Sequence, residues 1–306
     1  MKYRFSNQYK YMNIGGELIM NVKIYKTPNK FLEENEKLLL EKEAVSQLLL
    51  FNAINNKEKK CNPDLLFGKV SDDTNKAIIL FCNVIPYNLI IYGVESEFHK
   101  AAITELVHYI IDNKIHMKGL NASKFICDTF CEYYKEINRN SIFTEHLAMD
   151  IMELRELLDV NLSDGICRLA TSEDTNIIAE WIVDFAREAL SEELKIDEQI
   201  LRAEQMIEAK RFYVYVNTDS EIVSMAAVSR QLIHGICVNY VYTPKEYRGK
   251  GYAVSNVYSL SKNMLEHNQF CTLFVDRNNP ISNHAYKKIG YKIIEDNYDY
   301  RLTINE

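Results

Sequence analysis

The stretch from Val241 to Ala253 combines a strand-like run, a proline and a loop with two glycines that leads into a helix. At such a helix start the first backbone N–H groups lack intrahelical partners and the helix dipole is positive, so the site suits an anion such as a pyrophosphate. Gly249 and Gly251 would let the backbone approach the phosphates closely. Arg248 and Lys250 would add positive charge at the rim. Taken alone, the same residues could also form an exposed basic turn.

Two better-known phosphate loops do not fit this stretch. The pattern GxxxxGK[ST] is absent from the chain. A dinucleotide fold is disfavoured because GxGxxG is incomplete and no acidic residue ends a following strand at the expected distance. The loop therefore needs a further motif to define its ligand.

That motif follows one strand later, from Asn279 to Tyr291, and with it the sequence resembles the GNAT superfamily of N-acetyltransferases. The first signature of that family, [QR]xxGx[GA], is met by Arg248, Gly251 and Ala253. The second, Asn-x-x-[Ala/Ser]-x-x-x-Tyr-x-x-x-Gly-[Phe/Tyr], is met by Asn279, Ser282, Tyr286, Gly290 and Tyr291. The resemblance covers about residues 165–303 and reaches the first half only through the order of its elements.

The resemblance implies a binding site for acetyl-CoA as cosubstrate. In GNAT domains the strand before the loop splays from its neighbour and pairs with the pantetheine, and by position this falls to Val241, Tyr242 and Thr243. Asn279 and Asn283 would lie near the pantetheine or order the turn into the last helix, where Asn279 is also suited to be a helix cap. The residues expected to hold the pyrophosphate are Arg248, Gly249, Lys250, Gly251, Tyr252 and Ala253.

The reaction implied is direct attack of a primary amine, on a small molecule or peptide, on the thioester carbonyl. Tyr286 matches the family's usual general acid, since a phenol of ordinary pKa is close to the thiol that it protonates. The alternative is that Tyr286 only packs on its helix. Many family members place a glutamate base on the splayed strand, but here that position is Val238, and no carboxylate lies between residues 232 and 243. The general base would then have to be His234 acting through water, or water alone.

The elements that must position these residues occur in the same order in both halves: helices, three strands, helix, strand, helix and strand. Apolar spacing and turn signals predict them. In the first half they are a helix over 31–56, strands 64–70, 77–84 and 88–94, helix 99–113, strand 117–122 and helix 123–137, followed by a strand or bridge at 143–158. In the second half they are strand 166–170, a capping-box helix start at 171–174, helices 174–190 and 197–209, strands 212–216, 222–231 and 236–243, helix 251–268, strand 270–275, helix 282–289 and strands near 291–295 and 298–303.

The fold class predicted is α/β, with two GNAT-like domains, each a mixed, mostly antiparallel twisted sheet flanked by helices. Residues 161–165, mostly turn formers, mark the boundary between a degenerate domain, 1–160, and an N-acetyltransferase domain, 165–306. The first half has no comparable glycine loop, and Glu95 and Glu97 would repel a pyrophosphate at its helix start. Residues 1–19 are either a leader before a true start at Met20 or a genuine first strand.

Composition narrows the function classes. The 306 residues carry a net charge of −7, which argues against a general nucleic-acid binder. The sequence has no apolar run of membrane-spanning length and no signal peptide, so we expect a cytoplasmic protein. The seven cysteines form no metal-binding pattern, and we expect buried, reduced thiols and no metal.

Two other functions fit parts of the pattern. One is a tandem GNAT-fold transferase with a larger acyl donor, and the other is a non-catalytic CoA-binding sensor, suggested by the missing glutamate. The sequence is compatible with a monomer or a homodimer.

Overall fold

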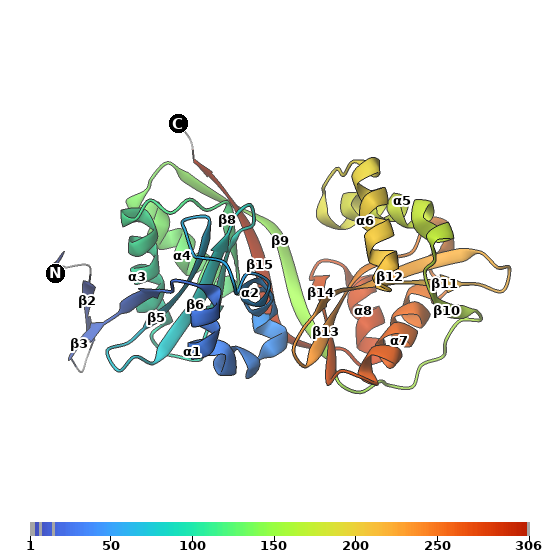
Figure 1. Cartoon of the computed structure of the whole chain (residues 1–306), viewed down its shortest axis with the longest axis horizontal. Helices are drawn as coiled ribbons and strands as arrows, with labels where there is room; N and C mark the ends of the chain where they lie inside the picture. The colour runs from blue at the N-terminus through green and yellow to red at the C-terminus, as the bar shows by residue number, and fades with distance from the viewer. Residues whose placement is uncertain (1–3, 6–7, 14–15, 305–306) are drawn as a thin grey trace. The chain divides into compact units, whose positions relative to one another are not determined.

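The chain divides into two compact units in the computed structural model, which describes residues 4–5, 8–13 and 16–304 (Figure 1). Unit 1 is built from residues 1–148 and 295–306, and unit 2 from residues 149–294. The division differs from a cut between residues 160 and 165, because the last residues of the chain return to the first unit. The independence of 1–160 and 165–306 as domains stays a prediction.

Unit 1 is an α/β layer structure. Its sheet has the strand order β4-β5-β6-β7-β8-β15, antiparallel except for the parallel pair β7 and β8. One apolar core lies between the sheet and helices α3 and α4, and a second involves α1 and α2. The elements are β4 (Asn21–Ile24), α1 (Pro28–Leu40), α2 (Glu43–Asn55), β5 (Leu65–Ser71), β6 (Ala77–Val84), β7 (Leu89–Gly93), α3 (His99–Asp112), β8 (Gly119–Ala122), α4 (Lys124–Ile137) and the first part of β9 (Ser141–Leu154). Ahead of them, β1 (Arg4–Phe5), β2 (Gln8–Asn13) and β3 (Gly16–Ile19) pair with one another, and the choice between Met1 and Met20 as native start stays a prediction.

The predicted helix over 31–56 is wrong in one respect, since the structure has two helices. Thr27 caps the first by accepting a hydrogen bond from the Lys30 N–H at 3.2 Å. The chain leaves helical geometry at Lys42, with φ −133° and ψ 59°. The Ser46 hydroxyl donates to the Leu39 carbonyl at 2.7 Å, so the second helix satisfies a carbonyl that the end of the first leaves open. The sequence does not show this break, because residues 41–43, Glu-Lys-Glu, include no glycine or proline and apolar residues continue at helical spacings on both sides.

Unit 2 has the same layer structure. Its sheet order is β10-β11-β12-β13-β14-β9, with β13 and β14 parallel and the other pairs antiparallel. Helices α7 and α8 pack on one face and α5 and α6 on the other. The elements are β10 (Ile166–Leu169), α5 (Thr175–Phe185), a π-helical turn (Ala186–Leu190), α6 (Ile196–Glu208), β11 (Phe212–Val216), β12 (Ile222–Gln231), β13 (Gly235–Tyr242), α7 (Tyr252–Leu265), β14 (Phe270–Asp276) and α8 (Pro280–Ile289). The last strand, β15 (Lys292–Ile304), starts in unit 2 and continues into unit 1.

The capping box predicted at 171–174 is present. The Asp174 carboxylate accepts a hydrogen bond from the Thr171 N–H at 2.7 Å. It also accepts two hydrogen bonds from Arg168, at 2.6 and 3.0 Å. This fixes the entry into α5, which carries the acceptor-side residues described below.

Two strands cross the division between the units. β9 begins in unit 1, and its residues 149–154 complete the sheet of unit 2 beside β14. β15 is one continuous strand where two were predicted, and its residues 298–301 complete the sheet of unit 1 beside β8. Each unit therefore takes one strand from the sequence half of the other.

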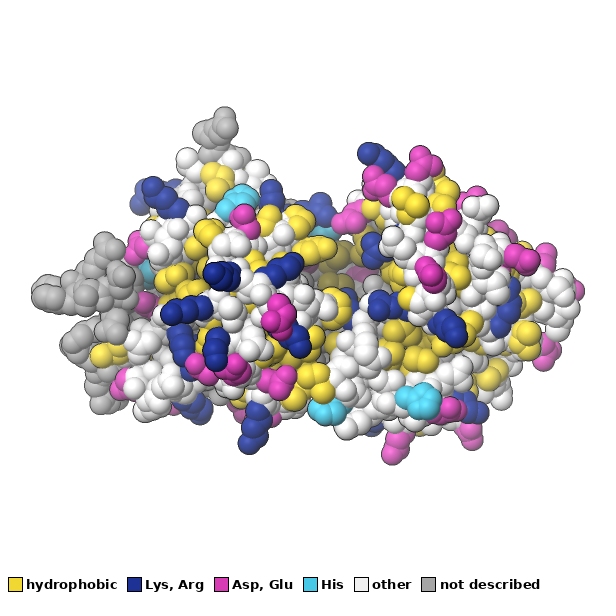
Figure 2. Space-filling view, in the orientation of Figure 1, with side chains coloured by type: hydrophobic (Ala, Val, Ile, Leu, Met, Phe, Trp, Pro, Cys, Tyr) yellow, Lys and Arg dark blue, Asp and Glu magenta, His cyan; other side chains and the backbone are white. Residues whose placement is uncertain are grey.

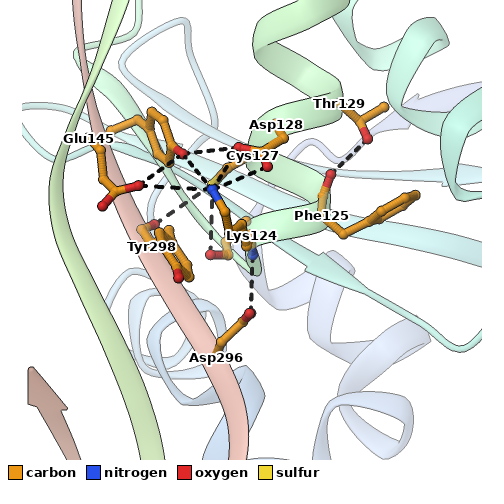
Figure 3. A network of polar contacts seen from close by, with 10 residues as sticks. Lys124, Phe125, Cys127, Asp128, Thr129, Glu145, Asp296 and Tyr298 are labelled. Carbon is orange, nitrogen blue, oxygen red and sulfur yellow. Dashed lines mark hydrogen bonds and ion pairs between the residues drawn. The ribbon is translucent and has the colours of Figure 1, made fainter. Parts of the chain in front are cut away.

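A polar network in unit 1 holds the returning strand β15 (Figure 3). The Lys124 ammonium lies 3.2 Å from the Asp128 carboxylate and 4.9 Å from the centre of the Tyr298 ring. The Tyr300 hydroxyl donates to Asp128 at 3.0 Å, and the Lys124 backbone N–H donates to Asp296 at 3.1 Å. Three residues of β15 are thus bound to the first turns of α4.

The surface mixes both signs of charge. On the face shown in Figure 2, lysine and arginine side chains are interspersed with acidic ones on both units. Among the described residues, no helix has the length and apolarity needed to cross a membrane. In the same residues no group of three or more His, Cys, Asp or Glu side chains could hold a metal ion.

Candidate acyl-CoA site in unit 2

The loop between β13 and α7 has the geometry of an anion site. Gly249 and Gly251 have φ of 80° and 81°, in the left-handed region that disfavours other residues. Helix α7 starts at Tyr252 without a side-chain cap, and a hydrogen bond at its start runs from the Ser255 N–H to the Gly251 carbonyl at 3.0 Å. The N–H groups ahead of Ser255 are therefore the donors that a helix start leaves open. Tyr252 and Ala253 therefore lie at the open start of the helix. Their binding of a pyrophosphate stays a prediction.

A residue from the predicted linker supports this loop. The Ser163 hydroxyl donates to the Lys250 carbonyl at 2.6 Å, and the Ser163 N–H donates to the Ser255 hydroxyl at 2.8 Å. A Cβ placed on Gly251 would lie 2.7 Å from the Ser163 Oγ, whereas one on Gly249 would meet nothing within 4 Å. Sequence reasoning missed Ser163, because nothing local links it to a loop more than eighty residues away.

Arg248 is held by protein groups. Its Nε donates to the Thr243 carbonyl at 2.8 Å, and its Nη2 donates to the Glu188 carboxylate at 2.6 Å. The Tyr242 hydroxyl donates to the same carboxylate at 3.3 Å. Burial, with a contribution from Glu188, raises the pKa of Tyr242 to about 12. Arg248 thus anchors the loop to the end of β13, while the exposed Lys250 lies with its ammonium 5.6 Å from the centre of the Tyr247 ring.

Glu188 was not predicted from the sequence. It lies in the π-helical turn at the end of α5, which the sequence presents as ordinary helix. Its carboxylate also lies 3.9 Å from the Lys245 ammonium. Single π-helical turns are frequent at functional sites, so the position of Glu188 in such a turn is consistent with a role at this site.

β13 separates from β14 in the region that the sequence assigned to the pantetheine. The parallel pairing runs only from Gly235 to Cys237, so the residues from Val238 to Tyr242 leave their β14-facing backbone edge unpaired. A bulge against β12 falls here, and Tyr240 has φ 50°. The Tyr240 N–H donates to the Asn239 side chain at 2.8 Å. Val241, Tyr242 and Thr243 lie at this opening, next to the glycine loop.

Tyr286 lies in α8 and is 9% exposed. Its ring packs edge-on against Tyr291, with the ring centres 5.9 Å apart, and belongs to the core between the sheet and α7 and α8. Burial raises the pKa of Tyr286 well above its usual value, so the phenol stays protonated at neutral pH. Among the described residues, none accepts a hydrogen bond from its hydroxyl.

Asn279 and Asn283 order the turn into α8. The Asn279 side chain accepts a hydrogen bond from the Ser282 N–H at 3.0 Å, which is the predicted helix cap. The Asn283 amide donates to the Asp276 and Asn279 carbonyls at 2.8 and 2.9 Å. Their polar atoms therefore hold the helix that carries Tyr286.

The structure offers no better base than the sequence did. Val238 is buried in the core beneath α7 and α8. His234 lies just before Gly235, at the paired end of β13, and six residues of strand put it about 20 Å from Tyr240. His234 is therefore too far from the opening to act there. Arg230, near the end of β12, reaches toward the opening, as described below.

Unit 1 lacks the corresponding chemistry. Its segment between β7 and α3 contains no glycine and exposes Glu95 and Glu97 before the helix start. The seventh residue of α8 is Tyr286, and the seventh residue of α4 is Phe130, which is fully buried. The first half thus presents carboxylates where unit 2 presents open N–H groups, and a ring without a hydroxyl where unit 2 has a phenol.

Comparisons with known proteins show which fold the chain has. The family model of FR47-like proteins matches residues 218–300, which span β12 to β15 and include both motifs. A GCN5-related N-acetyltransferase from Sphaerobacter thermophilus has a TM-score of 0.59 at 12% identity, covering 93% of this chain and 95% of its own. An acetyltransferase of the GNAT family from Colwellia psychrerythraea has a TM-score of 0.52 at 13% identity, covering 92% of this chain and 100% of its own. The search of the curated proteins found no match.

The fold predicted from the sequence is thereby confirmed. Both solved structures extend over nearly the whole chain, so the likeness includes unit 1 as well as unit 2. The chain has the fold of GNAT N-acetyltransferases.

Proposed function

We propose that unit 2 is an acetyl-CoA-dependent N-acetyltransferase that acts on a primary amine of a small molecule or peptide. One observation carries the proposal: the open start of α7 lies next to the place where β13 leaves β14. The helix start suits the diphosphate of coenzyme A, and the unpaired strand edge suits the amides of its pantetheine. An extended thioester bound to both would have its reactive end inside the sheet opening.

The neutral amine attacks the thioester carbonyl, and the carbon–nitrogen bond forms as the carbon–sulfur bond breaks. Backbone N–H groups of the separated part of β13 would polarise the carbonyl oxygen. Tyr286 would donate its proton to the departing thiolate, and the excess proton of the new ammonium would leave through water and restore the phenol. The phenol is protonated at neutral pH and, among the described residues, none accepts a hydrogen bond from it, so its proton is available for donation. Its raised pKa makes it a weaker acid than the ordinary phenol expected from the sequence, so the proposed transfer relies on the placement of the hydroxyl rather than on matched pKa values.

Unit 1 has no part in this chemistry under the proposal. Glu95 and Glu97 at the start of α3 would oppose a diphosphate, and Phe130 cannot donate a proton. We propose that residues 1–160 are a degenerate GNAT-like domain and residues 165–306 the transferase domain. The seven cysteines are free thiols, which fits a cytoplasmic protein, either a monomer or a homodimer.

A CoA-binding sensor without turnover is the second candidate, and the absence of a carboxylate on β13 favours it. Tyr286 favours the enzyme, because a sensor has no need of a buried phenol aimed at no protein acceptor. A transferase with an acyl donor longer than acetyl would use the same loop. Only a comparison of activity with different acyl-CoA donors would distinguish it from an acetyltransferase.

Calorimetry with acetyl-CoA and thiol release with a panel of primary amines test the proposal on the full chain. We expect micromolar or tighter binding, and turnover that falls by about 10²-fold or more in Tyr286→Phe while the affinity for acetyl-CoA is kept. Tyr291→Phe is the matched control, since it removes a buried hydroxyl from the neighbouring ring, where that hydroxyl is hydrogen-bonded with Ser261 at 2.9 Å. Tight binding without turnover on any amine would identify a sensor, and no binding would refute both candidates.

A further inference from the structure

The face of the unit 2 sheet opposite Tyr286 carries an aromatic cluster at the bulge of β13. The Tyr240 ring lies 5.7 Å from the ring centres of both Phe185 and Phe212. Its backbone has φ 50°, an unfavourable conformation for a bulky residue that this packing holds in place. Helices α7 and α8 cover the other face, so an amine must reach the sheet opening from the face of α5 and α6.

Two arginines lie on this same face. The Arg202 guanidinium, from α6, lies 5.5 Å from the centre of the Tyr240 ring. Arg230, from β12, crosses β13: its Nη2 lies 3.0 Å from the Cys237 Sγ, and its guanidinium lies 5.7 Å from the ring centre of Phe274 on β14. It therefore spans the two strands where their pairing ends. Burial raises the pKa of Tyr240, and the positive charges of both guanidinium groups oppose that rise.

Three acidic side chains in and just after the end of α5 are engaged with arginines other than Arg202. Asp184 and Glu193 lie 2.9 and 3.5 Å from Arg187. Glu188 binds Arg248. Arg202 is exposed, and among the described residues no carboxylate lies within ion-pair distance of it. The chain has a net charge of −7, yet Arg202 lies over an aromatic ring and not beside a carboxylate. Its guanidinium is therefore available to a ligand.

We propose that the acceptor amine also carries an anionic oxygen group, a carboxylate or a phosphate, and that Arg202 binds it at the β13 bulge, on the face of the sheet that also carries Arg230. A guanidinium presents two parallel N–H donors that match either group. With the anion held there, the amine of the same molecule would lie toward the sheet opening. This inference rests on the proposed function and adds the charge of its acceptor.

The test compares acceptors that differ only in this charge. L-phenylalanine is paired with L-phenylalaninamide, and O-phosphoethanolamine with ethanolamine, and each is titrated by calorimetry into the full chain saturated with CoA. We expect at least one anionic member to bind about tenfold tighter than its neutral partner. The carboxylate and phosphate pairs show which of the two anions is preferred.

Arg202→Met should abolish this preference and leave the affinity for the neutral partner and for acetyl-CoA unchanged. Arg155→Met is the matched control, because Arg155 also lies over an aromatic ring, 5.2 Å from the centre of Phe270, but at the paired end of β13 and β14. Equal affinities within both pairs, no binding of any anionic member, or a preference that survives in Arg202→Met would overturn the inference. Failure of the wild-type chain to bind acetyl-CoA would instead refute the proposed function.

Discussion

Replacing Gly251 by alanine is the sharpest perturbation of the phosphate loop. At φ 81° a residue with a Cβ costs about 1–2 kcal/mol relative to glycine. The new Cβ would lie 2.7 Å from the Ser163 Oγ, so Ser163 must move and give up its bond to the Lys250 carbonyl. That hydrogen bond is worth about 1 kcal/mol. The two effects together amount to about 2–3 kcal/mol, which corresponds to a 30- to 150-fold weaker affinity at about 1.4 kcal/mol per tenfold.

Calorimetry with acetyl-CoA measures this loss, and two further variants divide it. Gly249→Ala has the same backbone strain, φ 80°, and no neighbour to displace, so it should lose only the first contribution of about 1–2 kcal/mol, or about tenfold in affinity. Adding Ser163→Ala to Gly251→Ala should cost little further affinity, because the bond from Ser163 to the Lys250 carbonyl is already lost in the single variant. If Gly251→Ala binds acetyl-CoA as tightly as the wild type and unfolds at the same temperature, the loop does not hold the diphosphate and the reasoning fails.

Two further predictions concern contacts that support the site. Glu188→Gln removes the ion pair with Arg248 and should weaken acetyl-CoA binding about three- to tenfold, with the difference shrinking at high salt because the pair is partly exposed; an affinity that is unchanged at low salt would contradict the anchoring role of Arg248. Asp174→Ala removes the α5 cap and the partner of Arg168 and should lower the free energy of unfolding by about 2 kcal/mol at pH 7 in urea titrations. The hydrogen bonds from Arg168 and Thr171 outweigh burial and lower the pKa of Asp174, so its contribution is present above the unfolded value of about 3.9 and is lost as the pH falls through the folded value. The difference between wild type and variant should therefore narrow below pH 4, and a constant difference from pH 7 to pH 3 would contradict this assignment.

The local geometry of the glycine loop and of the helix starts in unit 2 could be predicted from the sequence. Pro244, Gly249 and Gly251 act through backbone geometry, which their residue types dictate, so the loop and the start of α7 could be predicted from them. Asn279 and Tyr286 likewise follow from a helix cap and a fixed spacing within one helix. These features depend on contacts within a few residues.

Long-range features were out of reach. Ser163 and Glu188 look like a linker residue and a helix-surface residue, and only the folded chain brings them to the loop. The exchange of β9 and β15 was missed because an alternating apolar pattern indicates a strand but does not name the sheet that it joins. The bulge at Tyr240 has no sequence signal either, since its left-handed backbone is held by rings from α5 and β11.

The exchange of β9 and β15 has a consequence for synthesis of the chain. Tyr298 and Tyr300 belong to the apolar core of unit 1, together with residues that leave the ribosome far earlier. Unit 1 can therefore close its core only after residues 298–300 have been synthesised, although the rest of that core comes from the first half of the sequence. Until then its sheet keeps an open position beside β8, and a nascent chain would have to be protected there from pairing with other strands.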